Sequence, residues 1–189
     1  MKKEHPFLTS GEDSVFAVLM AFSDKTDEEL INDMEKCFTI LKKDFSDGDA
    51  VQTMSHILAL AEGDPEEKCG RVAMLYNKLK EAGRKYSKYF ELAVLCAASL
   101  VNDDADEFIA DVISTDEYLS EQEGYNNLLG MDKKTRLMHA VMLVNIDRSG
   151  SENTAIAAMT GTLAMIAAQQ AAMCAIIAAS SASSAAASN

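Results

Sequence analysis

Proline is scarce in this chain. Only Pro6 and Pro65 occur among its 189 residues, and because proline interrupts helices and sheets, its rarity favours long, uninterrupted helices. The alternation of apolar and polar residues that marks a strand is also missing, since apolar residues recur at spacings of three and four. These two absences predict an all-α protein with at least seven helices and no sheet.

Charged side chains are absent from the end of the chain. Between Asn153 and Asn189 there is no Lys, Arg, Asp or Glu, and alanine dominates. The net charge of −13 therefore rests on the residues before 153, and so acidic a surface repels phosphate backbones and anionic lipid head groups. We expect no nucleic-acid partner, a helical-hairpin domain over 1–150, and an Ala/Ser-rich C-terminal helix with a frayed tail over 151–189.

Closely spaced cysteines and a secretory signal are missing as well. The four cysteines, Cys37, Cys69, Cys96 and Cys174, lie far apart without a CxxC spacing. Three of them have apolar helical neighbours, as buried, reduced thiols do, whereas Cys69 has more polar company. The N-terminus has a positive start but no apolar segment, so a cytoplasmic location is expected.

Capping signals mark where several helices begin. Thr26 and Glu29 form a capping box, Asp64 precedes a proline at the first helical position, and Asp132 can cap a later helix. A short helical turn over 116–122 is also compatible with the pattern. The predicted helices are 11–22, 27–43, 49–61, 65–82, 87–100, 105–114, 132–146 and 154–180.

These predicted helices repeat in pairs. The apolar runs 17–21, 57–61 and 93–97 each precede a polar turn and then the acidic start of a second helix. Their offset of roughly 36 to 41 residues is close to the period of two-helix solenoid repeats. A fourth unit can begin at Met138 and use the alanine-rich helix as its second member. Two arrangements stay open: a solenoid-like stack of helical hairpins, or an irregular helical bundle.

Several segments carry a resemblance to a known family. They are Pro6–Ser10, Ser55–Leu60, Leu75–Gly83, and the Ala/Ser-rich tail with its pair Gln169-Gln170. Together they resemble domain-of-unknown-function family 4003, an uncharacterised bacterial family found mostly in Gram-positive bacteria, over nearly the whole chain. The resemblance implies a helical fold and no site residues. Because the family carries further N-terminal helices, it also implies that this chain corresponds to the C-terminal two-thirds of a longer protein.

The residues that could suggest a metal site do not have the spacing of known metal-binding motifs. His56 and His139 each precede an apolar helical run, but zinc sites need three or four convergent ligands, and no HxxxH, HExxH or CxxC occurs. We expect both histidines to serve packing. Two acidic runs, one around Gly48 and one over residues 103–107, lack the alternate oxygens of a calcium loop and are expected at helix N-termini.

Catalytic and nucleic-acid-binding patterns are also missing. The basic cluster Arg84, Lys85 and Lys88, interleaved with Tyr86 and Tyr89, is small against a charge of −13, so we expect it to pair with acids or to lie in a solvated loop. No GxSxG elbow exists, and no cysteine has a histidine nearby in sequence. The sequence therefore assigns no catalytic residue and no cofactor.

The uncharged C-terminal segment carries an apolar seam with heptad spacing. Its members alternate at three and four residues, as at the a and d positions of a coiled coil: Ile156, Met159, Leu163, Ile166, Gln170, Met173 and Ile177. The seam can pack on the hairpins of its own chain, which we favour, or self-associate, or enter a membrane. Weakly apolar alanine, two central glutamines and missing Lys/Arg flanks argue against membrane insertion.

Two classes of function remain after these exclusions. The first is a non-enzymatic helical module for protein–protein interaction or self-association through the seam. The second is an enzyme or small-molecule binder with a site on the concave face, which shifted carboxylates in a deep pocket would favour. A membrane-tethered protein held by its C-terminal helix is a further alternative.

The seam leads to a testable prediction. Burial of a Leu or Ile side chain stabilises a protein by about 1.5–3 kcal/mol. Replacing Leu163 and Ile166 with Asp should therefore lower the melting temperature and reduce any oligomer. Light scattering and thermal unfolding measure both effects. An unchanged mass together with an unchanged melting temperature contradicts a contact role for the seam.

Overall fold

A computed structural model describes residues 25–87, 91–102, 104–125 and 131–149. In this part of the chain every regular element is a helix, which confirms the predicted all-α class. None of these helices combines the length and hydropathy needed to cross a membrane. The predicted helices 11–22 and 154–180 lie outside the described residues. The helices are α2 (Asp27–Leu41), α3 (Gly48–Leu60), α4 (Pro65–Glu81), α5 (Glu91–Ser99), α6 (Ala105–Glu121) and α7 (Lys133–Ser149).

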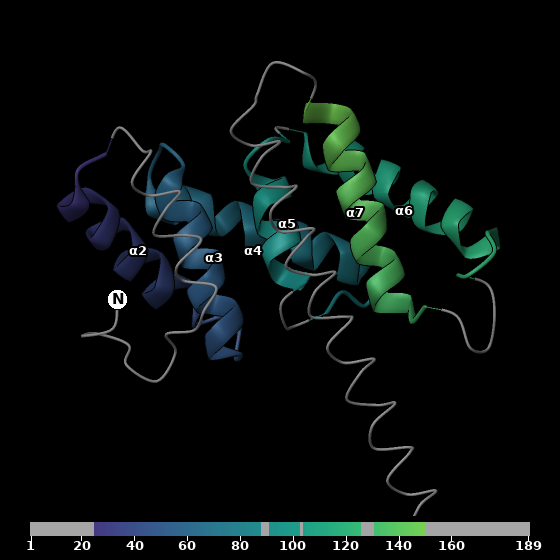
Figure 1. The fold of residues 1–189 in the computed structure, drawn as a ribbon, viewed down its shortest axis with the longest axis horizontal. Helices are drawn as coiled ribbons and strands as arrows, with labels where there is room; N and C mark the ends of the chain where they lie inside the picture. The colour runs from purple at the N-terminus through teal and green to yellow at the C-terminus, as the bar shows by residue number, and fades with distance from the viewer. Residues whose placement is uncertain (1–24, 88–90, 103, 126–130, 150–189) are drawn as a thin grey trace, which may run out of the picture.

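The helices stack in two layers. α5 contacts α3 and α7 in one layer, while α4 contacts α2 and α6 in the other, so consecutive helices alternate between layers. Figure 1 shows α2 and α3 at one end of this stack and α6 and α7 at the other, with α4 and α5 between them. Together the two layers form a helical bundle.

The closest pairs differ from the predicted hairpins. The most extensive contacts join α2 to α3 and α6 to α7, whereas α3 and α4, expected to form a hairpin, touch only slightly. α5 and α6 are not among the helix pairs in substantial contact. The reason is the central place of α5, which is only nine residues long and shares its surface among α3, α4 and α7.

The core is centred on α3 and α5. All nine residues of α5 are buried, in keeping with a run over 92–99 that contains no charged side chain. In α3, ten consecutive residues from 50 to 59 are buried apart from Thr53. Helices buried on all sides are enclosed by others, so α3 and α5 take the interior positions.

The capping residues lie where the sequence predicted them. Thr26 Oγ1 accepts from the Glu29 amide, and Glu29 closes the capping box by accepting from the Thr26 amide at 2.9 Å. Asp64 Oδ1 accepts from two amides of α4, and Asp132 Oδ1 does the same for α7. Gly83 ends α4 with φ +77°, a conformation that favours glycine.

The break predicted between 114 and 116 is wrong, because α6 continues through it to Glu121. Ser-Thr-Asp is typical of a helix start, since these side chains cap free amides. Here the Asp116 carboxylate is used elsewhere. Its Oδ1 accepts from Arg136 Nε of α7 at 2.7 Å, and its Oδ2 lies 3.3 Å from Arg84 Nη1.

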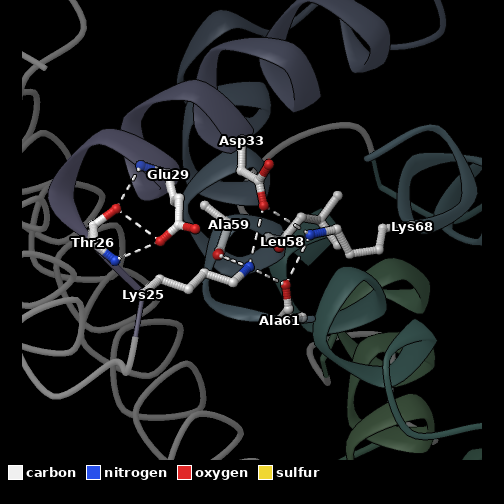
Figure 2. A network of polar contacts seen from close by, with 8 residues as sticks. All are labelled: Lys25, Thr26, Glu29, Asp33, Leu58, Ala59, Ala61 and Lys68. Atoms are coloured by element: carbon white, nitrogen blue, oxygen red, sulfur yellow. Dashed lines mark hydrogen bonds and ion pairs between the residues drawn. The ribbon is translucent and has the colours of Figure 1, made fainter. Parts of the chain in front are cut away.

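Two lysine side chains cap the C-terminal end of α3 (Figure 2). Lys68 Nζ, at the start of α4, donates to the carbonyl oxygens of Leu58 and Ala61, each at 2.8 Å. Lys25 Nζ reaches the same helix end and donates to Ala61 at 2.7 Å. Asp33 of α2 lies within ion-pair distance of both ammonium groups. These cations satisfy carbonyls that a helix end leaves without partners, and they favour its negative dipole.

Removal of the buried ammonium should destabilise the fold. Lys68→Met keeps the apolar stem, but it deprives the Leu58 carbonyl of its charged donor and Asp33 of one cation. We expect the free energy of unfolding to fall by about 2–4 kcal/mol, measured by urea denaturation. Lys78→Met is the matched control on the same helix, because Lys78 pairs with an exposed carboxylate and its loss should cost less than about 1 kcal/mol. Equal effects of the two substitutions contradict this role of Lys68.

Candidate functional site

The two histidines lie in packing positions. His56 is fully buried in α3, and its Nε2 lies 2.9 Å from the side-chain amide nitrogen of Gln52, one turn earlier, whose hydrogen bond it accepts. His139 of α7 is half-buried, and its Nδ1 is hydrogen-bonded to the Tyr125 hydroxyl at 2.7 Å. The Tyr125 and His139 rings meet edge to face. The described residues hold no group of three or more His, Cys, Asp or Glu that could bind a metal ion.

The acidic runs supply N-caps where the structure describes them. Asp47 Oδ1 accepts from the amide of Ala50 at 2.8 Å at the start of α3. Asp104 Oδ1 accepts from the amides of Asp106 and Glu107 at the start of α6. These carboxylates serve free amides and the positive end of the helix dipole, as the sequence predicted.

The described thiols are buried and poor nucleophiles. Cys37, Cys69 and Cys96 are free and at most 1% exposed, and Lys68, the polar neighbour of Cys69, is itself buried. The hydrogen bond to Cys37, and then burial, raise the pKa of Cys69, and burial raises the pKa of Cys96. The contact with Cys69 lowers the pKa of Cys37, which is the shift of a nucleophilic cysteine, but this side chain is fully buried and out of reach of a substrate. Cys174 lies outside the described residues.

The described carboxylates with a shifted pKa are shifted the wrong way for a general acid. The Thr26 amide and hydroxyl hold the pKa of Glu29 below its usual value. Burial raises the pKa of Asp132, but hydrogen bonds from Thr135 and the Lys134 amide outweigh burial and leave the pKa lowered. A carboxyl that donates a proton near neutral pH requires a raised pKa. This pattern belongs to helix caps and gives no support to an enzyme.

A cavity of about 480 Å³ opens where four segments meet. The segments are the α2–α3 connection, α4, the loop that follows α4, and the start of α7. The predicted basic cluster divides at this point: Arg84 pairs with Asp116 and Glu117, whereas Lys85 and Tyr86 line the cavity. Lys88 and Tyr89 lie outside the described residues. We call this space the lysine cavity; sequence reasoning missed it because its residues come from distant parts of the chain.

α7 presents an apolar edge to solvent. Its residues Leu137, Val141 and Val144 belong to the core, whereas Leu143 and Ile146 are 50% and 58% exposed. We call these two residues the α7 edge. They lie one to two turns before Ser149, where the described part of the chain ends and the uncharged segment follows. The seven seam residues, Ile156, Met159, Leu163, Ile166, Gln170, Met173 and Ile177, lie outside the described residues.

Comparison with known proteins identifies relatives without a known activity. A family described as "Protein of unknown function (DUF4003)" matches residues 1–171. "Uncharacterized protein YeaA" of Bacillus subtilis (strain 168) is 34% identical over 99 residues, which cover 50% of this chain and 30% of that protein. The matched part therefore spans less than a third of that relative. No solved structure matches the chain significantly.

The half-buried histidine should make stability depend on pH. Burial lowers the pKa of His139. In the unfolded chain the histidine pKa is about 6.5, so the unfolded chain binds a proton more readily than the folded one. The stability that comes from keeping His139 neutral in the fold is complete above the histidine pKa of the unfolded chain. It is lost as the pH falls below this pKa. Relative to His139→Gln, the wild type should lose stability between pH 7.5 and 5, by less than about 1.4 kcal/mol per pH unit in urea unfolding.

A matched variant separates titration from packing. Tyr125→Phe removes the hydrogen bond to His139 and keeps the titrating imidazole. This variant should be less stable at every pH and should still lose stability as the pH falls. If His139→Gln keeps the full pH dependence of the wild type, His139 is not its source.

Proposed function

The chain belongs to the DUF4003 family of proteins of unknown function, and we propose, on the basis of its surface, that it is a non-enzymatic helical module that self-associates. The observation that supports this proposal is the α7 edge. Two large apolar side chains, Leu143 and Ile146, are about half exposed on the last described helix. The segment without any charge begins at Asn153, a few residues after the end of this helix. Apolar surface of this kind on an acidic protein is typical of an interaction site.

The occupant that we propose is a second copy of the chain. An uncharged apolar seam and a nearby apolar edge occur in every copy, so both copies can bury the same residues in a symmetric pair. The seam residues from Ile156 to Ile177 carry flanking alanines, and small side chains permit close approach of two helices. Neither the seam nor the edge carries charges that would require desolvation, so association is favourable on burial alone.

The second class of function, an enzyme, has less support. Among the described residues, the cysteine whose pKa is lowered, Cys37, is buried, and no carboxyl group has a raised pKa. A catalytic site normally requires at least one such group in an accessible pocket. A cytoplasmic location is part of the proposal. Its support is the set of free, buried thiols Cys37, Cys69 and Cys96, which a reducing compartment preserves.

The α7 edge can be tested without disturbing the core. Leu143→Ser with Ile146→Ser removes side chains that are already half exposed, so the melting temperature of the dilute protein should stay within about 2 °C. Four half-exposed side chains in a symmetric pair contribute about 3–6 kcal/mol to association. We therefore expect the dissociation constant of the pair, measured by sedimentation equilibrium on the full chain, to rise at least about tenfold.

A control variant matches the change at another surface. Ile31→Ser with Met74→Ser alters two apolar residues of α2 and α4 that are 48% and 40% exposed. This variant should associate like the wild type. The proposal fails if the wild type stays monomeric at all concentrations, or if both variants weaken association equally.

A further inference from the structure

The lysine cavity concentrates positive charge in an acidic protein. Lys80 of α4, Lys85 of the following loop and Lys134 of α7 line it, against a single carboxylate, Asp44. The whole chain has 30 acidic and 17 basic side chains, so a local excess of lysine reverses the general balance. Three cations from three separate elements converge only because the fold brings those elements together.

These lysines have no counter-ion in the described part of the chain. Several other cations are paired: Lys78 with Asp106, Arg84 with Asp116 and Glu117, and Arg148 with Asp111. Lys80, Lys85 and Lys134 take part in no ion pair among the described residues. Their side chains are exposed, so their ammonium groups are available to an anion that enters the cavity.

The wall of the cavity is aromatic and held in place. Phe45 and Tyr76 meet edge to face with ring centroids 5.3 Å apart, an arrangement that fixes both rings. Tyr86 is buried, and its hydroxyl donates to the carbonyl oxygen of Glu91 at 3.0 Å, so this ring is anchored at both ends. An apolar wall with a few polar groups at one side is typical of small-molecule sites, whose volumes are about 300–1,000 Å³.

We propose that the lysine cavity binds an amphipathic organic anion. The apolar body of this ligand, a ring system or a short acyl chain, lies against Phe45, Tyr76 and Tyr86. Its carboxylate, sulfonate or phosphate group is held by Lys80, Lys85 and Lys134. This site is separate from the α7 edge, and its ligand binding does not depend on self-association.

Paired anionic and neutral probes test the charge requirement. Naphthalene-2-sulfonate and naphthalene-2-sulfonamide share one body and differ in charge, as do octanoate and octanamide. By isothermal titration calorimetry on the full chain, at least one anion should bind about tenfold more tightly than its neutral partner. Its affinity should fall as salt is added, while that of the neutral probe stays constant.

Matched lysine variants place the binding in the cavity. Lys80→Gln with Lys134→Gln should weaken the anion at least about tenfold and leave the neutral probe unchanged. Lys36→Gln with Lys133→Gln makes the same change in net charge at lysines that do not line the cavity, and Lys133 adjoins Lys134. This control should bind like the wild type. The proposal is overturned if neither anion binds below about 1 mM, if the neutral probe binds equally well, or if the control loses as much affinity as the cavity variant.

Discussion

The ammonium group of Lys68 is the contact on which the packing of three helices depends. Its side chain is fully buried, and it joins the start of α4 to the end of α3 while Asp33 of α2 supplies the negative charge. A cation in the interior is tolerated only where carbonyl oxygens and a carboxylate surround it. The position of this one atom therefore fixes how α2, α3 and α4 meet, and Cys37 and Cys69 pack beside it.

A second buried charge has the same role at the other end of the stack. Asp116 of α6 is reached by Arg136 of α7 and by Arg84 from the loop after α4. Both clusters join elements of different layers, and neither contains a group poised for chemistry. Ionic contacts inside this protein therefore specify the geometry of the stack. At the lysine cavity, in contrast, three lysines meet that take part in no ion pair among the described residues.

Local patterns were readable from the sequence, and long-range partners were not. The capping box of Thr26 and Glu29 involves residues three apart, so the local sequence alone indicates it. The false break at Asp116 arose because its true partner, Arg136, lies twenty positions away and takes the carboxylate that would otherwise cap a helix. The burial of Lys68 was not readable from its neighbours in sequence, because the Leu58 carbonyl oxygen that accepts from it lies ten positions away. Sequence reasoning missed the lysine cavity for the same reason, since Lys80, Lys85 and Lys134 share no motif.

The central place of α5 has a consequence for cooperativity. The two tightest pairs, α2 with α3 and α6 with α7, lie at opposite ends of the stack and touch each other only through the middle helices. α5 contacts α3 on one side and α7 on the other, while α4 contacts α2 and α6, so the two middle helices together couple the two ends. In a layered stack, unfolding spreads from neighbour to neighbour. The described helices therefore unfold as one unit only as long as α4 and α5 hold the two end pairs together.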